Sequence, residues 1–300
     1  MRKLFIAVVV STLTLSIAAP AQDASHHAPK YLTIQVEHVK AGRVAAHNKL
    51  EASWTAGIKK AGMKTNYLGL VSTSGPTEAW WISGFDSMAD IETSNNDSDS
   101  NAAMTAVNDK MSALDAEDVD QYSSMVARFS PELSYHPDVN IGEYKMVHVT
   151  VLHSKLGHGG DLVAAAKIFN DARDKAGDTE HIAAFEVVQG GRVGTILYFT
   201  PMKSLAEDDE SEMSKKVDAA IGEAGWKKLT EIADQAGITL DERMFNFAPS
   251  VSFPSKAMAE ANPDFWTPKM KMANASATAP EMAAKEAKSP TKKTATQAKK

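Results

Sequence analysis

Cysteine is absent from all 300 residues of the chain. This absence excludes disulfides, a cysteine nucleophile, a lipoprotein anchor and thiolate metal ligands, so any metal site must use histidine and carboxylates. The Gly-x-Ser-x-Gly motif of serine hydrolases is also missing. Ordinary acyl-transfer chemistry therefore has no support in the sequence.

Long apolar runs are missing except near the first residue. Arg2 and Lys3 precede an apolar run over residues 4–17, and Ala19-Pro20-Ala21 follows it. A basic start, a short apolar run and a small-x-small site are typical of a signal peptide. The run is too short for a comfortable bilayer-spanning helix. We therefore predict a signal peptide over 1–21, a linker over 22–29, no transmembrane segment after cleavage, and a periplasmic or secreted protein.

The other end of the chain is poor in bulky apolar residues. Residues 256–300 are dominated by Ala, Lys, Thr and Pro, which predicts a disordered basic tail. The formal net charge is −6 although both ends are basic, so the body is acidic and is not expected to bind nucleic acid. The tail either contacts anionic envelope polymers or is a solvated segment that aids solubility. "PDFWTP" at 263–268 either clips the tail onto the body or stays exposed.

One pattern occurs twice in the body. "RFSPELSYHP" begins at Arg128, and "NFAPSVSFPS", with a similar spacing of aromatic residues and proline, begins at Asn246. Ahead of each copy lie, in the same order, an alternating strand, a helix, two strands, an acidic stretch, a second helix and a fourth strand. The strands are expected at 31–39, 66–72, 79–85 and 123–129, and again at 144–152, 183–189, 195–200 and 242–247.

The order β-α-β-β-α-β is that of the ferredoxin-like unit. Its helices cover one face of the sheet, so the other face needs a partner. We predict an α+β fold of two tandem ferredoxin-like units, 30–138 and 139–255, whose antiparallel sheets pack face to face. Because each unit covers the other, the protein is expected to be a monomer.

With phrases such as "GFDSMADIE" after the third strand, this order resembles the dimeric α/β-barrel superfamily in a tandem form. That superfamily includes the NIPSNAP, antibiotic-biosynthesis-monooxygenase and EthD-like families. The resemblance implies an intramolecular barrel and either cofactor-independent oxygenation or haem degradation. Trp81 matches a tryptophan of the haem-degrading members. Gln35, however, replaces their strand-one asparagine, and no histidine occurs between Asp86 and Arg128, which argues against haem chemistry.

Strand alternation divides the residues between two faces. Uniformly apolar rows, such as Leu32-Ile34-Val36 and Val147-Val149-Val151, are expected to meet the helices. The opposite, mixed rows are expected to line a small-molecule cavity between the sheets. The predicted catalytic residues are Glu37 or His148 as base, with Arg128 or Tyr198 stabilising an oxyanion. The predicted ligand-binding residues are Gln35, Tyr67, Trp81, Ser83, Thr150, Glu186 and Asn246. A polar seam with a Glu37–Arg128 ion pair is the structural alternative.

Two metal motifs were weighed. His148, His153 and His158 recur at five-residue spacing, but they fall on a strand and in a Gly-rich loop, so convergence on zinc is not expected. "NNDSDSN" at 95–101 lacks the glycine and distal glutamate of a calcium loop and is interpreted as a solvated acidic loop. We predict no metal and no cofactor. The function then expected is small-molecule binding, with monooxygenase-like catalysis as one version. The alternative is a non-catalytic, envelope-associated binding or scaffold protein.

Overall fold

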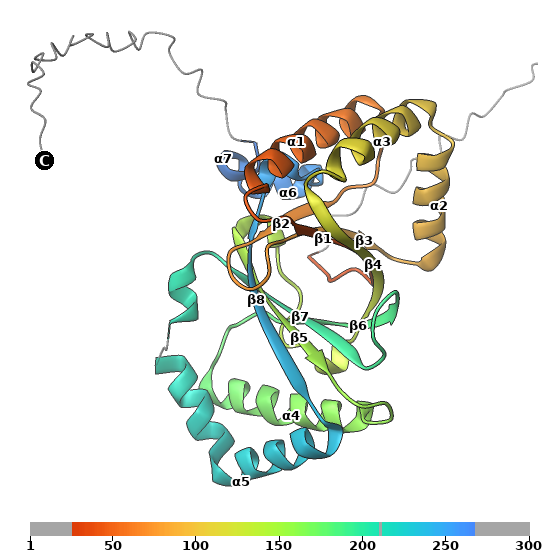
Figure 1. Cartoon of the computed structure of the whole chain (residues 1–300). Coiled ribbons are helices and arrows are strands. Elements are labelled where there is room, and N and C mark those ends of the chain that lie inside the picture. Colours follow the sequence, from red (N-terminus) through yellow and green to blue (C-terminus); the bar gives the residue numbers. More distant parts are fainter. Residues whose placement is uncertain (1–25, 210–211, 268–300) are drawn as a thin grey trace, which may run out of the picture. The chain divides into compact units, whose positions relative to one another are not determined.

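A computed structural model describes residues 26–209 and 212–267 (Figure 1). The predicted signal peptide and most of the predicted tail lie outside these residues. The strands are β1 (Tyr31–Val39), β2 (Leu68–Ser72), β3 (Glu78–Phe85), β4 (Val119–Phe129), β5 (Met146–His153), β6 (Ala183–Gln189), β7 (Thr195–Met202) and β8 (Thr239–Phe247). The helices are α1 (Val44–Lys60), α2 (Met88–Asp99), α3 (Ala102–Asp115), α4 (Gly159–Ala176), α5 (Glu212–Ala236), α6 (Lys256–Ala261) and α7 (Pro263–Trp266).

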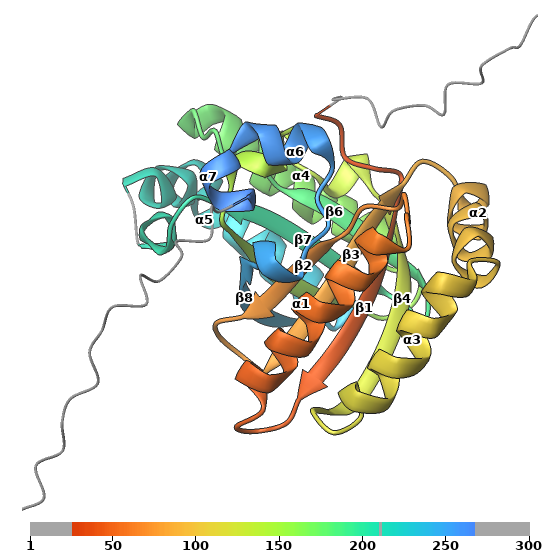
Figure 2. The same cartoon turned by 90° about the horizontal axis from the view of Figure 1, so that it is seen from above.

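The eight strands form one closed barrel in the order β1-β3-β2-β8-β5-β7-β6-β4. Each half therefore contributes four antiparallel strands. The halves join edge to edge through β2–β8 and β4–β6, where Val71 lies opposite Asn246 and Arg128 opposite Glu186. Helices α1 and α3 cover the first half, and α4 and α5 cover the second (Figures 1 and 2). The predicted α+β class is confirmed, and the sheets meet through hydrogen-bonded edges of one barrel.

The barrel interior is the main hydrophobic core. Ile34, Val149 and Phe245 are fully buried there, and the Trp80 ring packs at a tilt against Phe245 with ring centroids 5.0 Å apart. A closed barrel excludes water from its inner face on all sides, so that face takes the uniformly apolar rows of both halves.

The repeated sequence motif carries the chain from one half to the other. After β4, Tyr135 forms a bridge with Ile182 of the second half; after β8, Phe253 forms the equivalent bridge with Tyr67 of the first half. Ser134 and Ser252 each accept a hydrogen bond across this junction, from the backbone N–H of Ala184 (3.0 Å) and of Gly69 (2.9 Å). The motif occurs twice because each half needs one such junction.

Two predicted loops are helical. The acidic segment "NNDSDSN" belongs largely to α2, which begins where the Ser87 side chain accepts a hydrogen bond from the N–H of Asp90. The body also extends past the predicted boundary at 256. Trp266 is buried against Phe247 and donates from Nε1 to the carbonyl oxygen of Gly142 at 2.8 Å, so the described part of "PDFWTP", 263–267, holds the chain onto the body.

None of the helices in the described part of the chain has the length and apolar character needed to cross a membrane.

Candidate functional site

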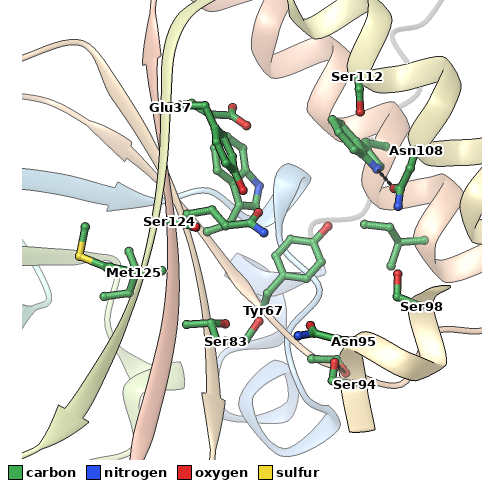
Figure 3. A pocket seen from close by; sticks show the side chains of 18 of the residues that line it. Glu37, Tyr67, Ser83, Ser94, Asn95, Ser98, Asn108, Ser112, Ser124 and Met125 are labelled. Atoms are coloured by element: carbon green, nitrogen blue, oxygen red, sulfur yellow. Dashed lines mark hydrogen bonds between the residues drawn. The ribbon is translucent and has the colours of Figure 1, made fainter. Parts of the chain in front are cut away.

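A large pocket lies between the sheet of the first half and its own helices, and we call it the helix-side pocket. Its volume is about 1070 Å³. Strands β1, β3 and β4 form one wall, and α1, α2 and α3 form the other (Figure 3). Figure 3 shows Asn108 and Ser112 of α3 facing Glu37, Tyr67 and Ser124 across the space.

Aromatic side chains held by hydrogen bonds line this pocket. Trp54 of α1 donates from Nε1 to Asn108 Oδ1 at 3.1 Å, which ties α1 to α3. The Tyr67 hydroxyl lies 2.8 Å from Thr55 Oγ1. Trp81 and Phe85 of β3 and Tyr122 of β4 add further rings to the lining. These contacts fix the ring positions, so the walls are preformed.

Four ionisable side chains gather at one end of the pocket, and we call them the acid–histidine cluster. They are Glu37, His47, Glu51 and Asp115, all buried. Glu37 comes from β1, His47 and Glu51 are four residues apart on α1, and Asp115 ends α3. The spacing on α1 places both side chains on the helix face that packs on the sheet.

The cluster is compact and incompletely hydrogen-bonded. His47 Nε2 lies 2.9 Å from Glu37 Oε2 and 3.6 Å from Asp115 Oδ1, the second distance being too long for a hydrogen bond. His47 Nδ1, Glu51 Oε1 and Asp115 Oδ1 are buried without a hydrogen-bond partner among the described residues. The edge of the Trp81 ring lies against His47, with centroids 5.7 Å apart.

Burial and mutual repulsion shift the pKa values of this cluster. Burial, and then the charge of Glu37, raise the pKa of Glu51 to about 8. The same two causes raise the pKa of Asp115 to about 6. Burial alone would lower the pKa of His47, but its hydrogen bond to Glu37 and the surrounding carboxylates outweigh burial and raise it. A group of shifted titratable residues in a cleft is the usual mark of a functional site.

The second half has apolar residues at the corresponding positions. At one constant offset along the chain, Glu37 corresponds to Leu152, His47 to Leu162 and Glu51 to Ala166. The strand registers agree, since Glu37 lies opposite Ala79 and Leu152 opposite Ile196. The three second-half residues pack together in one buried cluster with Leu133, Ala184 and Ile196. The fold therefore does not require charged groups at these places.

The prediction about which face lines a cavity was wrong. The apolar rows fill the barrel interior, and the mixed rows of the first half lie under α1, α2 and α3. The helices leave part of the outer face open, so that face accepts polar residues, whereas the enclosed barrel interior does not. Five predicted residues still share the helix-side pocket: Gln35, Glu37, Tyr67, Trp81 and Ser83.

The other predicted residues do not join them. Arg128 forms an exposed ion pair with Glu186 at 2.7 Å, so the expected Glu37–Arg128 pair does not form. Tyr198 packs beside the apolar cluster of the second half, and burial raises its pKa to about 12. His148 and Thr150 lie on β5 and Asn246 is exposed on β8, outside the helix-side pocket. The four predicted catalytic residues therefore do not form one site.

Sequence reasoning missed His47, Glu51 and Asp115. One available signal was the sheet-facing stripe of α1, which reads His47, Glu51, Thr55 where an amphipathic helix would place apolar residues. Among the described residues, the acid–histidine cluster is the group that could hold a metal ion, and it contains none of His148, His153 and His158. His153 contacts Thr195 and His158 contacts Asp161.

Comparisons with known proteins identify the fold. No protein-family model and no curated protein matches the chain. A solved anthrone oxidase-like protein matches with a TM-score of 0.50 at 10% identity, covering 75% of this chain and 93% of that one. A proposed monooxygenase from Lactobacillus acidophilus NCFM (TM-score 0.43, 8% identity, 73% and 93% covered) is also similar. So is a mutant chlorite dismutase from Candidatus Nitrospira defluvii (TM-score 0.43, 7% identity, 80% and 98% covered).

Proposed function

Because the chain has the fold of the dimeric α/β-barrel superfamily, we propose that it is an exported protein that binds a small organic molecule in the helix-side pocket of its first half. The observation that carries the proposal is the acid–histidine cluster at the end of a preformed, aromatic-lined pocket. Ligand sites of proteins typically combine apolar walls with a few converging polar groups.

The asymmetry between the halves supports this assignment. A buried charged cluster costs stability unless something compensates it, and the second half shows that apolar side chains fit the same frame. We take the two halves as tandem copies of one unit, of which the first carries the site. Export and a monomeric state belong to the same proposal and rest on the sequence pattern.

The finer proposal is a monooxygenase-like reaction without a cofactor. It rests on analogy of fold, because the anthrone oxidase-like neighbour shares the barrel. An activated CH₂ group of a phenolic or anthrone-type substrate would react with O₂ to give a carbonyl group and water. Glu37 is the one member of the predicted catalytic set that lines the pocket, so the substrate's reacting carbon would have to lie at the cluster.

Ligand binding tests the proposal. The purified protein is screened against phenols, anthrones and quinones by thermal shift and by tryptophan fluorescence, since Trp54 and Trp81 line the pocket. Trp81→Ala should weaken a genuine ligand by at least about tenfold through lost ring contact. Trp226→Ala is the matched control, because Trp226 lies on α5 of the second half.

A ligand that binds wild type and both variants equally would place its site elsewhere and contradict the proposal. Oxygen uptake in the presence of each ligand then tests the finer version. Binding without uptake would leave a binding protein and remove the monooxygenase-like reaction.

A further inference from the structure

The acid–histidine cluster brings three carboxylates together with little compensating positive charge. Among the described residues, His47 is the only basic side chain that forms an ion pair with any of them. Carboxylates at such short range repel one another, and burial strengthens the repulsion. Proteins relieve such repulsion by protonating a carboxylate or by binding a cation.

The donor atoms are close enough for one ion to contact all of them. Each of the four residues offers one oxygen or nitrogen, and these atoms lie within 4.8 Å of one another. Ligands on opposite sides of an ion are separated by about twice the metal–ligand distance of ~2.1 Å. Shifts of a few tenths of an ångström in the side chains would therefore complete the coordination.

Unpartnered buried atoms provide an independent sign of a missing ligand. Glu51 is 5% exposed, lines the pocket, and its Oε1 has no hydrogen-bond partner. His47 is fully buried, and its Nδ1 also lacks a partner. Buried polar atoms in native proteins are almost always satisfied, so several unpartnered atoms on the residues of one cluster point to a group that the cluster binds.

We propose that Glu37, His47, Glu51 and Asp115 bind one divalent first-row transition-metal ion, of the Mn²⁺ or Zn²⁺ type. Carboxylates suit Mn²⁺ and imidazole suits Zn²⁺, whereas an all-oxygen set would be expected for Mg²⁺ or Ca²⁺. The inference rests on the proposed binding function in one respect: the ion would face the organic molecule in the helix-side pocket, and it would replace the cofactor-free version of the reaction.

Metal binding is measured on the chelator-stripped full chain, with Mn²⁺, Zn²⁺, Mg²⁺ and Ca²⁺ added singly. Titration calorimetry gives stoichiometry and affinity, and elemental analysis of the dialysed protein confirms retention. We expect one Mn²⁺ or Zn²⁺ per chain and weaker binding of Mg²⁺ and Ca²⁺. Glu51→Gln removes one ligand charge with little change of shape and should weaken binding by at least about tenfold.

The matched control is Asp97→Asn on α2, which probes whether the acidic segment at 95–101 attracts the ion instead. This variant should bind like wild type. Circular dichroism and metal-free thermal unfolding show that each variant folds, and His47→Gln gives a second test of the cluster. Absence of stoichiometric binding would overturn the inference, as would binding that Glu51→Gln and His47→Gln leave unchanged.

The two proposals fail in different ways. An ion bound by the cluster without any organic ligand would retain the metal site and reject the proposed function. An organic ligand that depends on Trp81, in a protein that binds no ion, would do the reverse.

Discussion

The two halves of the barrel share the same arrangement of strands and helices, which we call the frame. They differ in the side chains between the first strand and the first helix of each half, a region that we call the corner. In the first half, Glu37 and His47 meet beneath α1; in the second, Leu152 and Leu162 meet beneath α4. The strand order and the junctions between the halves are equivalent. The comparison acts as an internal control: the second half shows what the fold alone needs, and the cluster is what the first half adds.

The difference also separates stability from function. Charged groups that share a buried site cost free energy, and the apolar solution was compatible with the same strands and helix. A cluster kept at such a cost is expected to bind or react. The most informative experiments therefore exchange the two corners or test them in parallel.

The largest expected effect comes from giving the first half the residues of the second. The triple variant Glu37→Leu, His47→Leu, Glu51→Ala should lose ion binding completely, because one candidate ligand remains. Its metal-free free energy of unfolding should be at least that of wild type, since buried polar groups are replaced by apolar ones. Titration calorimetry and chemical denaturation measure the two quantities. A triple variant that fails to fold would show that the cluster is structural.

The reverse exchange should harm the second half. Leu162→His places an imidazole among the apolar side chains of Leu152, Ala166 and Ile196. We expect a loss of about 2–4 kcal/mol in the free energy of unfolding. Denaturation at pH 7 measures it, with the solvent-exposed Leu240→His as control. Equal effects of both variants would mean that the second-half corner tolerates polar groups and would weaken the comparison.

The metal-free protein should lose stability as the pH rises. The pKa of Glu51 is raised from 4.5 to about 8, so the folded state binds its proton more tightly than the unfolded state does. This stabilisation is complete below pH 4.5 and is lost as the pH rises to about 8. Glu37 from β1, Asp115 from α3 and His47 on α1 face Glu51, and Tyr67 lies close to it. The raised pKa values of Asp115 and His47 act in the same direction.

Between pH 5 and 8.5, the free energy of unfolding of Glu51→Gln should therefore fall less than that of wild type, by on the order of 2 kcal/mol. Denaturation in the presence of EDTA at several pH values measures the difference between the two proteins. Parallel pH curves would show that Glu51 titrates normally and is not in the environment described.

The smallest effects on stability are expected at the two equivalent junctions between the halves. Ser134→Ala and Ser252→Ala each remove the acceptor for a buried N–H at the junction of the halves. Each should cost about 1–2 kcal/mol, and the two costs should be similar. Thermal unfolding measures both. A large difference between them would mean that the frame, and not the corner alone, differs between the halves.

The local pattern of the sequence predicted the elements well. Alternation located β1 and β6 at the residues where they occur, because a strand with one enclosed face must alternate. The same alternation could not tell which face was enclosed more completely. The prediction placed the apolar rows against the helices, whereas they face the barrel interior. It still assigned Trp81 and Glu37 to the same face, where both line the pocket.

Other features depended on tertiary structure that local patterns do not carry. The acidic composition of α2 hid a capped helix, and the Ala- and Lys-rich composition after Ser255 hid the helices that bring Trp266 into the core. Asp115 joins the cluster only because α3 ends over β1. His47 and Glu51 could have been predicted from the sequence. A position-by-position comparison of α1 with α4 shows them at places where the second half has Leu162 and Ala166.

One measurement tests the central claim most directly: anomalous X-ray scattering from crystals of the full chain soaked separately with Mn²⁺ and with Zn²⁺. The account predicts a single strong peak among Glu37, His47, Glu51 and Asp115, with no equivalent peak beside Leu162. A peak only at the acidic face of α2, or no ordered ion with either metal, would contradict it.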